Sequence, residues 1–158
     1  MAEKTPWNTA LNMLARREYS QSELRTRLTD RFPDQPDAVE AALLRLVETG
    51  LQNDERYAEA FLRSQINRSR GPVRVQHEAR QKGVAELVLP LLDEWDIDWF
   101  ELALDAARRK LGSSDPADQK IRARLARFLA YRGFSGDHVR HSLEALRSED
   151  STDTDGFD

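Results

Sequence analysis

Apolar residues recur along most of the chain at spacings of three and four positions, which is typical of amphipathic α-helices. The clearest apolar face consists of Ile121, Leu125, Phe128 and Leu129. Glycines stand after several apolar runs, where a helix would end, because glycine adopts the left-handed conformation of a C-terminal cap without strain. These glycines are Gly50, Gly83, Gly112 and Gly133. The pattern predicts an all-α fold with helices over residues 7–17, 21–31, 36–49, 54–68, 72–82, 85–94, 98–111, 116–132 and 136–147.

Residues that favour helix starts precede several of these segments. Ser20 and Glu23 have the spacing of a capping box, and Asp54 can cap the segment that follows it. Proline is favoured at the first helical position, which predicts starts at Pro72 and Pro116. Pro90 is the exception, because proline inside a helix removes a hydrogen bond and clashes with the preceding turn. The helix around Pro90 is therefore expected to kink or to start late.

The predicted helices group into three units of three, because apolar and glycine positions repeat at a distance of fifty residues. Val75, Ala79, Gly83 and Val84 correspond to Leu125, Leu129, Gly133 and Phe134. Repeats of this kind bury a continuous core by packing on their neighbours, which predicts an elongated, curved helical rod. We expect an N-terminal extension at 1–6, three-helix repeats at 7–52, 53–96 and 97–147, and an acidic disordered tail at 148–158.

The composition agrees with a helical protein that has much surface per residue, since 39% of residues are hydrophobic and 33% are charged. No cysteine occurs, which excludes disulfides, thiolate zinc sites and thiol nucleophiles. The first residues contain no apolar targeting segment, and no apolar run is long enough to span a bilayer. We therefore expect a cytoplasmic protein without membrane contact.

The charge is unevenly distributed in a chain of formal net charge −4. Residues 63–82 contain six basic residues and one acidic residue, and residues 119–136 contain five basic residues and no acidic residue. The last ten residues, EDSTDTDGFD, contain five acidic residues and no basic one, which is typical of a solvated, disordered tail. The two basic segments are the part of the charge pattern that predicts a binding surface.

The sequence GLQNDERYAEAFLRSQINRSRGPVRVQHEARQKGV, at residues 50–84, resembles the central motif of the RecX family, which regulates the RecA recombinase. The resemblance extends on both sides, through REYSQSELRTRL and through KIRARLARFLAYRGFS, and covers about residues 7–146. It implies a non-enzymatic protein that binds RecA and the RecA–DNA filament and restrains strand exchange, ATP hydrolysis and co-protease activity in DNA repair and the SOS response. Weak, salt-sensitive DNA binding is implied as well. We expect a monomer without a cofactor.

The basic segments and one exposed aromatic residue are the predicted contacts to DNA or a protein partner. Lys120, Arg124, Arg127 and Tyr131 share one helical face, where guanidinium groups can bind phosphate or carboxylate oxygens. The full set of predicted contact residues is Arg63, Arg68, Arg70, Arg74, Arg80, Lys82, Lys120, Arg124, Arg127, Tyr131 and Arg132. Gly71 before Pro72 leaves two interpretations open: an anion site at the helix N-terminus, or a glycine that serves the turn alone.

Other classes of function find less support in the sequence. The histidine pair His138 and His141 lacks accompanying carboxylates on its helix, so a solvated pair is expected rather than a metal site. No glycine-rich phosphate loop is present, and no catalytic group of side chains is recognisable, so we expect neither catalysis nor a metal. A helix-turn-helix DNA-binding protein and a helical scaffold that binds only protein remain as alternatives. The recognition helix of the first alternative, residues 85–94, contains no Lys or Arg.

Overall fold

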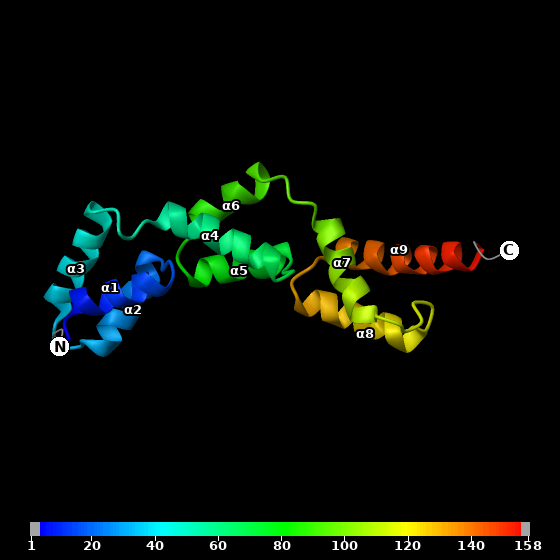
Figure 1. The fold of residues 1–158 in the computed structure, drawn as a ribbon, viewed down its shortest axis with the longest axis horizontal. Helices are drawn as coiled ribbons and strands as arrows, with labels where there is room; N and C mark the ends of the chain where they lie inside the picture. The colour runs from blue at the N-terminus through cyan, green and yellow to red at the C-terminus, as the bar shows by residue number, and fades with distance from the viewer. Residues whose placement is uncertain (1–3, 156–158) are drawn as a thin grey trace. The chain divides into compact units, whose positions relative to one another are not determined.

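The computed structural model describes residues 4–155, with side chains described for residues 4–151, and this part of the chain is helical without strands (Figure 1). Its helices are α1 (Pro6–Arg16), α2 (Gln21–Arg31), α3 (Pro36–Glu48), α4 (Asp54–Asn67), α5 (Pro72–Gln81), α6 (Ala85–Glu94), α7 (Trp99–Leu111), α8 (Gln119–Tyr131) and α9 (Gly136–Asp155). The all-α prediction is confirmed, and each predicted helix has a counterpart.

Most helix ends follow from the local signals in the sequence. The capping box at the start of α2 is complete, because the Glu23 amide donates to Ser20 Oγ at 3.0 Å and the Ser20 amide donates to Glu23 Oε1 at 3.4 Å. The four glycines predicted at helix ends all have positive φ. At the start of α4 the cap is Asn53, whose Oδ1 accepts from the Arg56 amide, so the expectation for Asp54 was wrong.

Three other details differ from the sequence prediction. α8 begins at Gln119 rather than at Pro116, because the Asp118 side chain accepts from the amides of Lys120 and Ile121 and caps the helix there. α6 begins at Ala85, ahead of Pro90, so a late start is wrong.

The end of the last helix also differs, because α9 continues well past residue 147, to Asp155. The Glu149 carboxylate pairs with Arg108 of α7 at 2.7 Å, and Ser151 Oγ donates to the Arg147 carbonyl. These contacts stabilise the first turns beyond the predicted boundary. The last three residues of the predicted tail, 156–158, lie outside the described residues.

The chain forms two compact units. The first comprises residues 1–63 and 78–94, and it contains α1–α3 around one apolar core. That core consists of Ala10, Tyr19, Leu24, Leu28, Phe32, Val39, Leu43 and Leu46. Tyr57, Leu62, Val84 and Val88 of the same unit are buried as well. The first unit therefore combines the first three-helix repeat with much of the second.

The second unit comprises residues 64–77 and 95–158. Its core lies between α7, α8 and α9 and consists of Ala103, Leu104, Ala106, Ala107, Leu111, Leu125, Leu129, Phe134 and Leu146. The apolar positions that match fifty residues apart are all buried in their respective units, from Val75 and Ala79 to Leu125 and Leu129. The predicted core faces of the second and third repeats are thereby confirmed.

Candidate functional site

Four arginines gather in the second unit, and we call Arg70, Arg74, Arg109 and Arg132 the arginine cluster. They come from the α4–α5 turn, the start of α5, the end of α7 and the residue that follows α8. Burial, together with the positive charges of the three other arginines, lowers the pKa of Arg132 below its ordinary value. Because the positive charges of these arginines repel one another, binding of an anion that neutralises them is favourable. The cluster is therefore an anion-binding candidate.

The α4–α5 turn holds two of these arginines through Ser69. The Arg109 guanidinium donates to Ser69 Oγ at 2.6 Å, and Arg132 Nε donates to the Ser69 carbonyl at 3.3 Å. A second Arg132 nitrogen donates to the carbonyl of Arg68. Ser69 itself is buried, with φ of +55°. The turn thus holds the Arg109 and Arg132 guanidinium groups through carbonyl and hydroxyl acceptors. None of these acceptors is a carboxylate, so these contacts do not neutralise the positive charges.

Gly71 lies where the α4–α5 turn meets the turn after α8. Its amide donates to the Arg132 carbonyl at 2.8 Å, and the Val73 amide donates to the Gly133 carbonyl at 3.0 Å. A Cβ on Gly71 would lie 2.3 Å from the backbone carbon of Gly133. Of the two interpretations left open, the structure supports the glycine that serves the turn, because amides that an anion would need are already bonded to carbonyls.

An exposed aromatic ring stands beside the cluster. Tyr131 is 78% exposed, and the Arg74 guanidinium carbon lies 5.7 Å from the centre of its ring. Val73 on the first turn of α5 is also exposed. An exposed ring next to cations is the arrangement with which proteins stack bases of single-stranded nucleic acid while cations contact phosphates.

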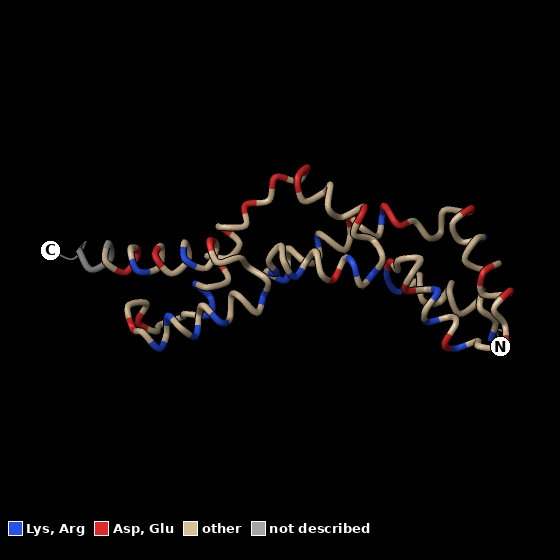
Figure 2. Tube along the Cα trace, turned by 180° about the vertical axis from the view of Figure 1, so that it is seen from behind, with Lys and Arg blue, Asp and Glu red and all other residues tan. Residues whose placement is uncertain are grey.

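A basic face runs along α8, and we call Lys120, Arg124 and Arg127 the α8 stripe. All three are exposed, whereas Leu125 and Leu129 on the other side of the helix are buried. None of the three forms an ion pair with another described residue. Figure 2 shows Lys and Arg following α8, with Asp and Glu confined to the turn before it. The predicted separation of the two faces is confirmed, while the binding role of the stripe stays a prediction.

Of the remaining predicted residues, Arg68 belongs to the second unit and contributes its carbonyl to the contact with Arg132, whereas Arg63, Arg80 and Lys82 belong to the first unit. Arg63 lies on α4 and Arg80 near the end of α5, and both are exposed. Lys82 lies in the first unit, where its Nζ contacts Glu23 Oε2 at 3.2 Å. This ion pair gives Lys82 a structural role.

Glu23 is the acceptor around which this part of the first unit is organised. It is 9% exposed, and Arg17 approaches its Oε2 at 3.0 Å, while the capping contact uses its Oε1. Burial alone would raise the pKa of the Glu23 carboxyl, but hydrogen bonds from Arg17 and Tyr57, with the charge of Lys82, hold it below the ordinary value of 4.5. The ionised carboxylate therefore stabilises the contact of α2 with α1, α4 and the end of α5.

We expect Glu23→Gln to reduce the free energy of unfolding by about 1–2 kcal/mol at neutral pH, since it removes two partly exposed ion pairs from a buried carboxylate. A depressed folded-state pKa contributes stability above the unfolded-state pKa and loses it as pH falls through the folded-state pKa. The difference between the two proteins should therefore shrink as pH falls below 4.5. Urea unfolding across this pH range measures it.

The matched control is Glu40→Gln, which removes an exposed ion pair with Arg25 and should change little. A difference between Glu23→Gln and the unchanged protein that stays constant down to acid pH would contradict a role for the charge.

The histidine pair differs from its prediction. His138 is buried, and its ring meets Phe100 edge-on with 4.6 Å between ring centres, whereas His141 is exposed. Burial lowers the pKa of His138, and its Nδ1 accepts from the Ser135 amide at 3.2 Å. A solvated pair was therefore wrong for His138, which belongs to the packing of α9. Within the described residues no group of three or more possible metal ligands occurs.

Sequence reasoning missed Arg109 as a member of the cluster. It lies in the sequence ARRKL at the end of α7, where cations are expected for a different reason, because they interact favourably with the helix dipole. Its contact with Ser69 spans 40 residues, and no local pattern marks it. Among residues 4–155, no helix is long and apolar enough to cross a membrane.

Comparisons with known proteins agree on one family. The chain matches the family models described as RecX, first three-helix domain, over residues 7–46, RecX, second three-helix domain, over 53–88, and RecX, third three-helix domain, over 96–143. It is 40% identical over 144 residues to the regulatory protein RecX of Halorhodospira halophila, covering 90% of this chain and 89% of that protein. It is 39% identical over 141 residues to the regulatory protein RecX of Stenotrophomonas maltophilia, covering 89% and 86%.

Solved structures agree in fold. The crystal structure of RecX from Lactobacillus salivarius superimposes with a TM-score of 0.66 at 23% sequence identity, covering 89% of this chain and 94% of that one. A second crystal structure, of regulatory protein RecX, gives a TM-score of 0.67 at the same identity and covers 88% of this chain and 70% of that one.

Proposed function

Since this chain belongs to the RecX family, we propose that it is a non-enzymatic regulator that binds the RecA nucleoprotein filament and restrains its strand exchange, ATP hydrolysis and co-protease activity. The protein would act as a monomer in the cytoplasm, in DNA repair and the SOS response. The relatives at about 40% identity are named regulatory proteins, which supports regulation rather than catalysis.

The observation that carries the proposal is the arginine cluster with Tyr131 at its side. A filament of protein on single-stranded DNA offers phosphates, unstacked bases and acidic protein side chains. Guanidinium groups bind both phosphate and carboxylate oxygens, and an exposed ring stacks on bases without regard to sequence. A regulator of filaments formed on any sequence needs contacts of this sequence-independent kind.

The same geometry disfavours sequence-specific reading through α5 and α6. α6 contains Glu86, Asp93 and Glu94 and no basic residue, and Figure 2 shows acidic residues along it and the connection that follows. Base edges and phosphates in a major groove require donors on the recognition helix. The helix-turn-helix alternative is therefore less well supported than contact with the DNA backbone.

We expect this protein, added below the concentration of RecA, to lower the DNA-dependent ATP hydrolysis of RecA filaments, since a regulator that acts on filaments affects many subunits through few contacts. A coupled ATPase assay measures the rate, and sedimentation with RecA filaments measures binding. The protein without RecA should hydrolyse no ATP. An unchanged rate at saturating protein would exclude the proposal.

A further inference from the structure

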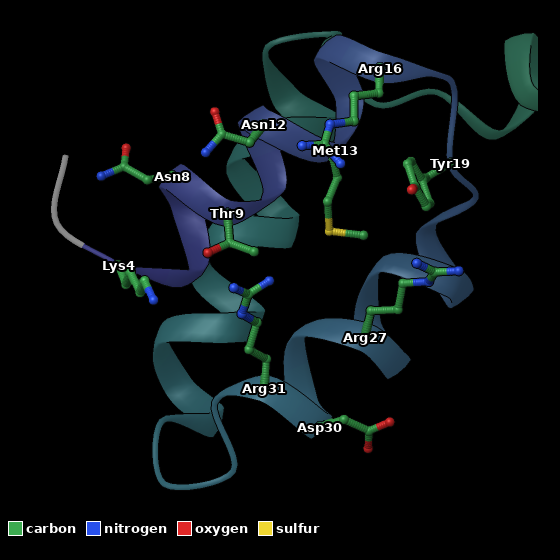
Figure 3. A pocket seen from close by; sticks show the side chains of 10 residues that line it. All are labelled: Lys4, Asn8, Thr9, Asn12, Met13, Arg16, Tyr19, Arg27, Asp30 and Arg31. Carbon is green, nitrogen blue, oxygen red and sulfur yellow. The ribbon is translucent and has the colours of Figure 1, made fainter. Parts of the chain in front are cut away.

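A cavity of about 700 Å³ lies between α1 and α2 of the first unit (Figure 3). Its cationic lining consists of Lys4, Arg16, Arg27 and Arg31. None of these four forms an ion pair with another described residue. Among the described residues of the lining, Asp30 is the only acidic one, and its carboxylate points away from the other side chains in Figure 3. The described residues of the lining therefore carry an excess of three positive charges.

A hydroxyl also belongs to the lining of this cavity. The Thr9 residue is 9% exposed as a whole, and within the described chain its side chain makes no hydrogen bond, so its hydroxyl is available to a ligand. Figure 3 shows the Arg31 side chain extending from α2 toward Thr9 on α1. A ligand oxygen placed between them would satisfy the hydroxyl and accept from the guanidinium together.

Size and charge together select the class of ligand. Cavities of roughly 300–1,000 Å³ hold compounds of small-molecule size rather than a stretch of macromolecule. Carboxylates of an acidic peptide carry one charge each and are separated by backbone, whereas a di- or triphosphate concentrates three or more charges in one compact group. Three guanidinium groups and an ammonium around one cavity match the second arrangement.

We propose that this cavity is a binding site for a diphosphate or triphosphate group, with Arg27, Arg31 and the Thr9 hydroxyl as its principal contacts. The group would come from a soluble nucleotide or from the phosphorylated end of a nucleic acid strand. The site is independent of the arginine cluster, which belongs to the other unit, and it binds without hydrolysis, because the chain has no glycine-rich phosphate loop.

The phosphate, and not an attached base, is the group that the site recognises. Tyr19 is the one aromatic residue of the lining, but it is buried, and the Arg17 guanidinium carbon lies 3.6 Å from the centre of its ring. Arg27 approaches the same ring at 5.4 Å. Since these cations contact the ring, it offers no face on which a base could stack. Affinity should therefore depend little on the identity of the base.

Calorimetric titration of the full chain with inorganic pyrophosphate at low ionic strength tests the proposal. We expect one pyrophosphate per chain, similar affinity for ADP, and no binding of adenosine, which lacks phosphate. Arg27→Gln with Arg31→Gln should weaken pyrophosphate binding at least tenfold, because each lost charge-assisted hydrogen bond corresponds to about tenfold in affinity. Thr9→Val, which keeps the shape and removes the hydroxyl, should weaken it severalfold.

The control is Arg25→Gln, which removes one positive charge from the same helix outside the cavity and should leave binding unchanged. Circular dichroism and the melting temperature check that Arg27→Gln with Arg31→Gln folds, and both residues are exposed. No heat from pyrophosphate, or equal affinity in this variant and in the unchanged chain, would overturn the site.

Two further ligands decide the source of the phosphate. A 5′-phosphorylated oligonucleotide that competes with pyrophosphate better than its 5′-hydroxyl counterpart assigns the site to strand ends. Competition by ADP alone assigns it to soluble nucleotides. Competition by a tetraglutamate peptide at the affinity of pyrophosphate would overturn the phosphate assignment in favour of carboxylates. None of these measurements involves RecA, so they stand apart from the test of the proposed function.

Discussion

Gly71→Ala is expected to reduce the free energy of unfolding by about 3 kcal/mol or more, which is large for one methyl group. The added Cβ would lie within 2.4 Å of three backbone atoms of Gly133 and Phe134, a distance that only movement of the backbone can relieve. Such overpacking costs roughly 1–3 kcal/mol. Separation of the two turns also breaks the hydrogen bonds from Gly71 to Arg132 and from Val73 to Gly133, at about 1 kcal/mol each.

Thermal unfolding followed by circular dichroism measures the effect, which should lower the melting temperature by roughly 6–12 °C for a chain of this length. The matched control is Gly136→Ala at the first position of α9, where the new Cβ meets only the movable end of the Arg140 side chain. If Gly71→Ala melts within a degree or two of this control, the close approach of the two turns is wrong.

The same substitution should loosen the arginine cluster, because Arg132 belongs to the turn that Gly71 contacts. Its carbonyl accepts from Gly71, while its guanidinium donates to Ser69 and Arg68. Gly71 therefore allows the close packing of the two turns and also holds the turn that positions the Arg132 guanidinium. This is the physical reason why neither of the two interpretations of Gly71 was complete when taken from the sequence.

Helix positions could be predicted because their signals are local. The Ser20 and Glu23 pair lies within one turn, and glycines after apolar runs have positive φ in the structure. The errors arose where two local signals compete. At α8 the Asp118 side chain forms two hydrogen bonds that Pro116 cannot form, and at α9 contacts from Arg108 extend the helix beyond the last apolar residues.

The candidate site was predictable only in part, for the same reason. The α8 stripe follows from helical periodicity, which fixes the face of each residue. Contacts between residues that are distant in the sequence produce no periodic pattern in it, so they could not be predicted. The sequence therefore showed Lys82 as one more basic residue, although its partner Glu23 lies 59 positions away, and it gave no sign of Arg109 beside Ser69. The cavity between α1 and α2 likewise depends on how two helices pack.

The largest functional effect is expected from removing the arginine cluster's Arg74 and the α8 stripe together. Each lost phosphate contact reduces the salt slope of log affinity for single strands by about 0.7. Arg74→Gln with Lys120→Gln, Arg124→Gln and Arg127→Gln should therefore lower the slope by roughly 3 and, at ~0.1 M salt, weaken binding to single-stranded DNA about 10³-fold. Fluorescence anisotropy with a labelled oligonucleotide across a salt series measures both.

A charge-matched control separates these contacts from a general loss of positive charge. Its four substitutions, also to glutamine, are at Arg25, Arg45, Arg140 and Arg147, which are exposed and lie outside the arginine cluster and the α8 stripe. The control should keep most of the slope, because only cations that contact phosphates release counterions and contribute to the slope. An equal loss of slope in both proteins would show that only net charge matters.

Tyr131→Ala distinguishes base stacking from phosphate contact, because the two interactions affect the salt dependence of binding differently. Loss of a stacked base costs about 1–3 kcal/mol of affinity but releases no counterion, so the affinity should fall while the salt slope stays the same. Tyr131 is 78% exposed and its ring lies beside Arg74, so its removal should leave the melting temperature unchanged. If the variant with four substitutions keeps the slope of the unchanged protein on DNA and yet fails to bind RecA filaments, the basic surface contacts RecA, and the assignment to phosphates is wrong.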